Sequence, residues 1–422
     1  MRPLQRSIKR LHGWERLEVE GELPKDLRGT LIRTGPGLLE RFGKRVSHPF
    51  EADGVLSGLR LGDDGEAHAS VRVVESPGYL AEEAAGKALF GMTASWWRRW
   101  LAMFRGTTKT TGNTSVMHWQ GRTYALMEGG RPVEIDHTTL KTSEVVDFDG
   151  ALGPAFSAHP HRVHSRATTY NFGQVYGPKP ALQLYELPDH GPARMLGKID
   201  MPWNTMVHDF AIAGRTMVFV ICPAKMRIAK IMLGAADFAQ WFKWDASTAA
   251  QLILVDLDDI ENPKRIDIDA RWVFHLANAH MRSTSELVID WVQYPDFNVF
   301  ASLSADGESA DGESADGESA DATTSSLERL VIDLRAGTVR SQEVLLPESC
   351  EFPVLPVASV GHAYTTSWYA LAAPGIARFD AETGALDAWR PGKGHIASEP
   401  VFVPRDGAPS DPGTDTDTGT DK

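Results

Sequence analysis

A short hairpin pattern recurs along most of the chain and limits the folds that it can adopt. Each copy is an apolar strand that ends at an aspartate, followed by a turn and a second strand, as in residues 133–136, 252–256, 330–338 and 377–384. The 38 glycines and 25 prolines suit many tight turns and few long helices. Short strands separated by such turns predict an all-β protein.

Three histidines stand in separate short motifs. His159 lies in Ser-Ala-His-Pro-His, His208 in Met-Val-His-Asp-Phe and His275 in Val-Phe-His-Leu-Ala-Asn-Ala. Neutral imidazole is the commonest protein ligand for transition metals. These histidines are too far apart for one helix face, but their intervals suit one ligand per β unit. Because the inner strand of each propeller blade lines the axis, the pattern favours a β-propeller over a sandwich. His161 should point to the other face of an extended strand, as a pocket or hydrogen-bonding residue.

Two acidic tracts carry most of the net charge of −13. Residues 304–321 repeat Ser-Ala-Asp-Gly-Glu without large apolar side chains, which predicts a disordered loop at 302–326 between two strands. Residues 406–422 predict a disordered tail. A single propeller domain should therefore occupy residues 1–405, with a nearly neutral surface. Nothing in this charge pattern indicates nucleic-acid binding, which needs a basic surface.

The segment near residues 80–105 differs from the rest of the chain. It lacks proline, is rich in alanine and carries Trp96, Trp97 and Trp100 beside arginines, which predicts a short helical cap. The alternative is peripheral contact with a membrane through the three tryptophans. Two cysteines, no secretory signal and no long apolar run predict a cytoplasmic protein, or one at the membrane surface.

Seven stretches together resemble the carotenoid cleavage oxygenase family, whose members include apocarotenoid- and stilbene-cleaving oxygenases and the isomerohydrolase of the retinal pigment epithelium. They occur in the family's order, at residues 23–37, 125–130, 157–161, 207–210, 274–279, 351–353 and 398–405. The resemblance implies a seven-bladed β-propeller with Fe(II) on its axis, held by four histidines.

The resemblance also implies roles for single residues. His159, His208 and His275 match three of the iron ligands. Glu128, Glu351 and Glu399 match glutamates that accept hydrogen bonds from ligand imidazoles, with Glu128 orienting His208 and Glu351 orienting His275. Such a carboxylate fixes the tautomer and orientation of the ring and makes the ligand more basic.

The implied activity is a dioxygenase reaction. With O₂, the enzyme cleaves a conjugated carbon–carbon double bond of a carotenoid, apocarotenoid or stilbene-like substrate and releases two carbonyl products. Five aromatic residues flank the ligand motifs and are candidates either for the wall of a substrate tunnel or for ordinary core: Phe156, Phe210, Trp272, Phe274 and Phe352.

The chain departs from the family pattern at one ligand. No histidine follows His395, so the fourth ligand is missing and the last blade should be incomplete. Three interpretations stay open: an incomplete version of an active oxygenase, a chain that binds iron with three histidines and water, and an inactive relative that binds a hydrophobic ligand or a partner. An oxygen-independent isomerase is a further alternative. The substrate and the oligomeric state stay undetermined.

Overall fold

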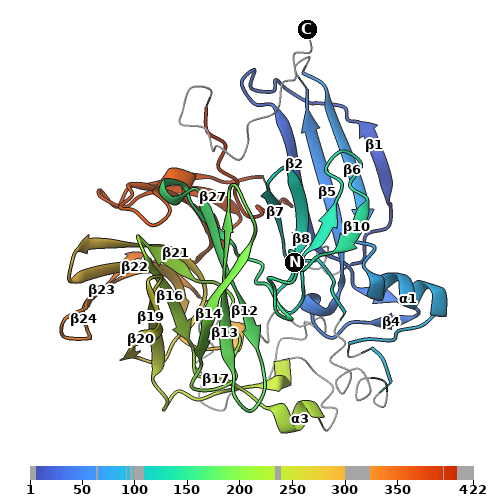
Figure 1. Cartoon of the computed structure of the whole chain (residues 1–422). Helices are drawn as coiled ribbons and strands as arrows, with labels where there is room; N and C mark the ends of the chain where they lie inside the picture. The colour runs from blue at the N-terminus through green and yellow to red at the C-terminus, as the bar shows by residue number, and fades with distance from the viewer. Residues whose placement is uncertain are drawn as a thin grey trace, which may run out of the picture.

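The computed structural model describes residues 6–62, 65–91, 93–95, 98, 109–232, 239–299, 324–392 and 394–405. These residues form six four-stranded and two two-stranded antiparallel sheets, and Figure 1 shows the larger sheets side by side around the molecule. The prediction of an all-β propeller is therefore confirmed. The resemblance implied seven blades, whereas the described part of the chain contains six four-stranded sheets.

In each four-stranded sheet, neighbouring strands are hydrogen-bonded in the spatial order given below. The first three sheets are β1 (His12–Arg16), β6 (Ala67–Val73), β5 (Asp53–Leu61) and β2 (Gly29–Leu38); β10 (Thr142–Val145), β9 (Val133–Ile135), β8 (Arg122–Leu126) and β7 (Ser115–Trp119); and β11 (His161–Val163), β12 (Thr168–Val175), β13 (Ala181–Pro188) and β14 (Arg194–Asp200). The last three are β15 (Ala211–Ala213), β16 (Thr216–Ile221), β19 (Ala250–Asp256) and β20 (Asp259–Ile268); β21 (Trp272–Ser283), β22 (Glu286–Tyr294), β23 (Ser326–Asp333) and β24 (Thr338–Leu346); and β25 (Cys350–Val354), β26 (Thr366–Leu371), β27 (Gly375–Asp380) and β28 (Leu386–Trp389).

The remaining elements are short. They are the pairs β3 (Glu40–Arg41) with β4 (Lys44–Arg45) and β17 (Ala224–Met226) with β18 (Phe242–Trp244), the helices α1 (Pro77–Ala85) and α3 (Ile228–Met232), and the 3-10 turns η2 (Pro49–Glu51), η3 (His164–Arg166), η4 (Ala239–Trp241) and η5 (Val357–Ser359).

The aspartates of the hairpin pattern close the turns. In the turn between β23 and β24, Oδ1 of Asp333 accepts hydrogen bonds from the backbone N–H groups of Arg335 and Ala336, both at 2.9 Å. Gly337 follows with φ +67°, a conformation that glycine adopts without strain. Asp380 and Gly384 repeat the arrangement between β27 and β28. The recurring aspartate is therefore a turn residue that satisfies backbone donors.

The inner edge strands bring distant segments together. β11, β15, β21 and β25 are each the first strand of a sheet, and each contacts the next one in this series. The first sheet meets the C-terminal segment 394–405, where Arg33 donates to Oγ of Ser398 at 3.2 Å and to the backbone oxygen of Glu399. Residues that lie on or just before these strands therefore face a common axis.

Apolar side chains fill the space between neighbouring sheets. The largest cluster joins the fourth, fifth and sixth sheets and includes Trp272, Trp291, Tyr369 and Phe379, all at most 1% exposed. Burying one such side chain stabilises a fold by roughly 1.5–3 kcal/mol. This core holds the inner strands at fixed positions.

The predicted helical cap near residues 80–105 is not confirmed, because most of its second half lies outside the described residues. α1 begins at Pro77, earlier than predicted, and ends at Ala85, where Gly86 adopts the left-handed conformation. Trp96, Trp97 and Trp100 lie outside the described residues. Buried ion pairs join Glu82 of α1 to Arg41 at 2.6 Å and to Lys109 at 2.7 Å. Glu82 therefore links α1 to Arg41, which precedes the segment predicted to be helical, and to Lys109, which follows it.

The acidic tracts also fall mostly outside the described residues, including 302–323 and 406–422. The predicted loop was too long at its C-terminal end, because Ser326 is the first residue of β23. Before it, Oγ of Ser325 donates to the backbone oxygen of Cys350 at 2.6 Å. No helix in the described ranges is long and apolar enough to cross a bilayer.

Candidate metal centre

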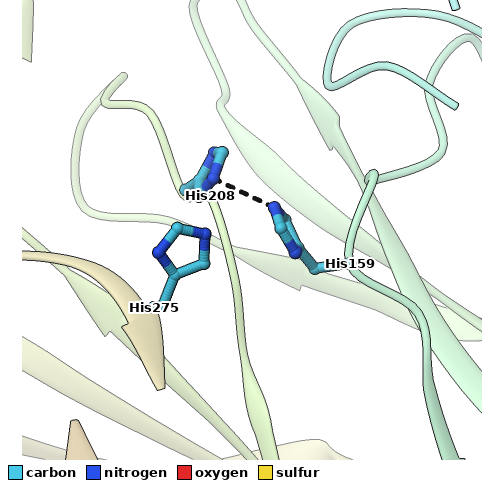
Figure 2. Close-up of side chains that lie close together, drawn as sticks. All are labelled: His159, His208 and His275. Atoms are coloured by element: carbon cyan, nitrogen blue, oxygen red, sulfur yellow. Dashed lines mark hydrogen bonds between the residues drawn. The ribbon is translucent and has the colours of Figure 1, made fainter. Parts of the chain in front are cut away.

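Three histidines from three sheets meet at the axis. His159 lies two residues before β11, His208 lies three residues before β15, and His275 lies within β21. One ring nitrogen of each lies within 4.8 Å of those of the other two. Figure 2 shows the three rings close together, on three separate segments. The structure therefore brings the three histidines of the sequence motifs together.

The spacing and protonation of these rings suit a metal ion. Nε2 of His159 lies 3.0 Å from Nε2 of His208. Two nitrogens bound to a metal at about 2.1 Å and at right angles are about 3.0 Å apart. Burial lowers the pKa of both histidines well below the usual value, and neighbouring histidines lower it further. Both rings are therefore neutral, with a lone pair available for a metal.

Glu351 holds His275 through a short hydrogen bond. Nδ1 of His275 donates to Oε2 of Glu351 at 2.6 Å, which leaves Nε2 for the other histidines. The glutamate also accepts from the hydroxyl of Tyr294 at 2.9 Å and from the backbone N–H of Phe352 at 2.8 Å. Burial would lower the pKa of His275, but the Glu351 carboxylate outweighs it and raises this pKa to about 9.

Two local irregularities build this pair. Between Val273 and Leu276, β21 carries one residue more than its partner β22, which is a β-bulge at Phe274 and His275. β25 is irregular just after Glu351, where Phe352 has φ +55°. A non-glycine residue in this region costs free energy, and strained backbone of this kind recurs at functional sites.

Glu128 lies behind His208 with a looser geometry. It follows β8, and its Oε1 lies 3.2 Å from Nδ1 of His208 and 3.9 Å from Nε2 of His159. Oε1 of Glu128 and Nδ1 of His208 are buried and have no hydrogen-bond partner in the described part of the chain. Burial raises the pKa of Glu128 well above the usual value, and the charge of Asp209 raises it further.

Comparisons with known proteins identify the family. The family described as "Retinal pigment epithelial membrane protein" matches residues 8–419. The chain belongs to this family of carotenoid cleavage oxygenases. It is 32% identical over 413 residues to the apocarotenoid-15,15'-oxygenase of Synechocystis sp., covering 92% of this chain and 81% of that protein. It is 25% identical to an isoeugenol monooxygenase of Pseudomonas nitroreducens, covering 92% and 82%.

Solved structures of the family share the fold. The cobalt-substituted apocarotenoid oxygenase of Synechocystis has a TM-score of 0.81 and 28% identity to this chain. The match covers 96% of this chain and 86% of that one. The fold and the family inferred from the seven sequence stretches are therefore both supported by independent comparisons.

Glu399, the third predicted glutamate of this family member, is placed differently from the other two. It is exposed and lines a cavity of about 250 Å³ together with His159, His275 and Phe352. Its carboxylate makes no hydrogen bond or ion pair with a residue that the structure describes, although its charge helps to raise the pKa of His275. Glu399 faces the centre without holding an imidazole.

The sequence motifs contain one further carboxylate at the centre, Asp209, for which the sequence alone predicted no role. Asp209 is 5% exposed, and its Oδ1 accepts a hydrogen bond from Nε2 of His161 at 2.7 Å. His161, predicted to be a pocket or hydrogen-bonding residue, also lines the cavity. The signal for Asp209 was its position next to His208.

The five aromatic candidates divide into core and cavity residues. Phe352 lines the cavity and is 40% exposed. Phe156, Phe210 and Trp272 are fully buried in apolar clusters, so the core alternative is correct for them. Phe274 is 7% exposed and packs edge-on against His208 at 5.5 Å between ring centroids.

Proposed function

We propose that this chain is a non-haem Fe(II) oxygenase that cleaves a conjugated carbon–carbon double bond with O₂ and releases two carbonyl products. One observation supports this proposal above all. Three imidazoles on separate inner strands converge at the axis, with Glu351 behind one ring and Glu128 behind another, in a chain of this family.

The residues present fit an iron site. His159, His208 and His275 would be its ligands, each offering one nitrogen. When bound, the iron supplies the binding and activation of O₂ that the cleavage requires. Glu351 fixes the ring of His275 and keeps its Nε2 toward the centre. Glu128 lies where it can accept the proton on Nδ1 of His208.

The substrate class follows from the relatives and from the balance of the reaction. The relatives are named for apocarotenoids, isoeugenol, resveratrol and lignostilbene, which share an alkene conjugated to further double bonds or to a ring. Cleavage of such an alkene breaks one C=C bond and places one oxygen atom of O₂ on each carbon. We assign a hydrophobic polyene or stilbene-like substrate to this chain.

The proposal is tested on full-length protein loaded anaerobically with Fe(II). An apocarotenal, isoeugenol and resveratrol are offered separately, and O₂ consumption and aldehyde formation are both followed. We expect one iron per chain and one O₂ consumed per alkene cleaved for at least one substrate. His208→Ala should lose both the iron and the turnover. A metal-free wild-type protein, or a conversion that consumes no O₂, would contradict the proposal.

A second candidate is an impaired relative that binds a hydrophobic ligand without turnover. The exposed carboxylate of Glu399, which makes no hydrogen bond with a residue that the structure describes, favours it. Iron binding together with binding of an alkene, but without O₂ consumption, would support this candidate.

Finer points of the fold and location are also proposals. We propose that segment 394–405 contributes to a seventh blade, because Arg33 joins this segment to the first sheet. We also propose a cytoplasmic protein that contacts membranes through Trp96, Trp97 and Trp100. In vesicle flotation, the triple alanine variant should float less than wild type, and equal flotation would exclude that contact.

A further inference from the structure

The buried carboxylate of Asp209 contacts residues that lie close in sequence to each of the three histidines. Oδ1 of Asp209 accepts hydrogen bonds from Nε2 of His161 at 2.7 Å and from the backbone N–H of Phe210 at 2.8 Å. Oδ2 accepts from the backbone N–H of Leu276 at 2.9 Å. Asp209 is 5% exposed, so these three donors replace water around its charge.

Each contact lies close in sequence to one proposed ligand. His161 is two residues after His159, Asp209 itself follows His208, and Leu276 follows His275. The carboxylate therefore joins β11, the start of β15 and β21 just beside the points where their histidines leave the backbone. The ligands come from three different sheets, and the hydrogen bonds of Asp209 add direct links between the segments that carry them to the packing of the core.

The β-bulges in β21 make the contact with Leu276 important. Leu276 is flanked by irregular pairings with β22 on both sides, so the ladder alone holds this part of the strand less firmly. The hydrogen bond from its N–H to Asp209 supplies a fixed point directly after His275. A shift of this strand would move His275 relative to His159 and His208.

A carboxylate suits this place better than an amide. All three partners are donors, and an ionised carboxylate only accepts. An asparagine would direct its NH₂ group at one of them. The negative charge of Asp209 also lies near the three proposed histidine ligands. None of these ligands is a carboxylate that could offset the charge of a divalent metal.

We infer that Asp209 is a positioning residue that sets the geometry and the affinity of the three-histidine centre by tying its three strands together. The inference rests on the proposed metal site, and it adds a residue that is not one of the three proposed ligands. It is distinct from the glutamates behind the rings, because Asp209 holds backbone and a neighbouring side chain.

The chain offers a matched control in Asp290 of β22. Asp290 is 1% exposed and also accepts three hydrogen bonds, from Nε and Nη2 of Arg329 at 2.8 and 2.9 Å and from the hydroxyl of Tyr364 at 2.7 Å. The isosteric changes D209N and D290N therefore remove one buried charge each. Only Asp209 joins the strands that carry the histidines.

The test compares the affinity of the full chain for Co(II), and the visible absorption bands of the bound Co(II), in wild type and both variants. We expect D209N to bind Co(II) about 10- to 100-fold more weakly and with shifted bands. D290N should lower the melting temperature but leave the affinity within about threefold of wild type and the bands unchanged. His161→Gln, which keeps the aspartate, should weaken binding less than D209N and serves as the readout if D209N does not fold.

Several outcomes would overturn the inference. The inference fails if D209N binds Co(II) with the affinity and absorption bands of wild type. It also fails if D209N loses no more affinity than D290N, because either result shows a merely structural role. If D209N does not fold, wild-type affinity in His161→Gln has the same meaning. A wild-type chain that binds no Co(II) overturns the proposed function as well, so the two failures are distinguishable.

Discussion

Two glutamate–histidine pairs flank the same centre, and they are built differently. On one side, Glu351 receives three hydrogen bonds and raises the pKa of His275 to about 9. On the other side, burial raises the pKa of Glu128, while that of His208 is lowered. Without metal, the Glu351 carboxylate therefore favours the charged form of His275, whereas burial favours the neutral forms of Glu128 and His208.

The difference lies in the number of donors around each carboxylate. The hydroxyl of Tyr294 and the backbone of Phe352 stabilise the charge of Glu351, whereas Oε1 of Glu128 has no hydrogen-bond donor among the described residues. The comparison teaches that two glutamates with the same expected role contribute unequally. Glu351 orients its imidazole before any metal arrives, and the following predictions test this inequality.

Glu351→Gln should have the largest effect. The amide cannot form the ion pair with His275, and its NH₂ group is a poor partner for the donors of Tyr294 and Phe352. Metal affinity should fall by about 10- to 100-fold, the usual range for a lost carboxylate behind a ligand histidine. Titration with Fe(II) under anaerobic conditions measures the change, and an affinity equal to that of wild type would remove Glu351 from this role.

Metal affinity should also depend on pH through His275. Because the pKa of His275 is raised to about 9, this ring carries a second proton at neutral pH in the metal-free protein, and the metal must displace that proton. Apparent affinity should therefore rise about tenfold per pH unit between about pH 6 and about pH 8, with release of about one proton per metal. A pH indicator in weak buffer counts these protons. Release of none would show that His275 is neutral before binding.

Tyr294→Phe should have a smaller effect than the loss of Glu351. It removes one of the three donors to Glu351 and leaves the ion pair in place. We expect the free energy of unfolding to fall by about 1 kcal/mol, and metal affinity by less than about fivefold. Urea unfolding and metal titration measure the two changes. A loss as large as that of Glu351→Gln would show that the hydroxyl, and not the ion pair, determines the affinity.

Glu128→Gln should have the smallest effect on metal affinity. Because burial already favours the neutral carboxyl in the metal-free protein, an amide of the same shape changes little, and its oxygen can still accept from His208. Affinity should stay within about threefold of wild type. A loss equal to that of Glu351→Gln would show that the metal draws Glu128 into its charged form and would end the contrast between the pairs.

Much of the fold and of the site could be predicted from single motifs. The aspartate and glycine of each hairpin specify a local turn, because the carboxylate satisfies nearby backbone donors. The three histidine motifs and the seven stretches in order identified the family, which the comparisons then showed. The first residue of β23 was misplaced because the serines before it resemble the acidic repeat in composition.

The sequence by itself determined the turns, the residue types at the centre and the family. Only the tertiary structure decided how these residues work together. The hydrogen bonds of His275 with Glu351 and of Asp209 with His161 and Leu276 join segments that are far apart in the chain. The same holds for the different surroundings of Glu128 and Glu351, since burial and the number of nearby donors arise only when the sheets pack around the axis.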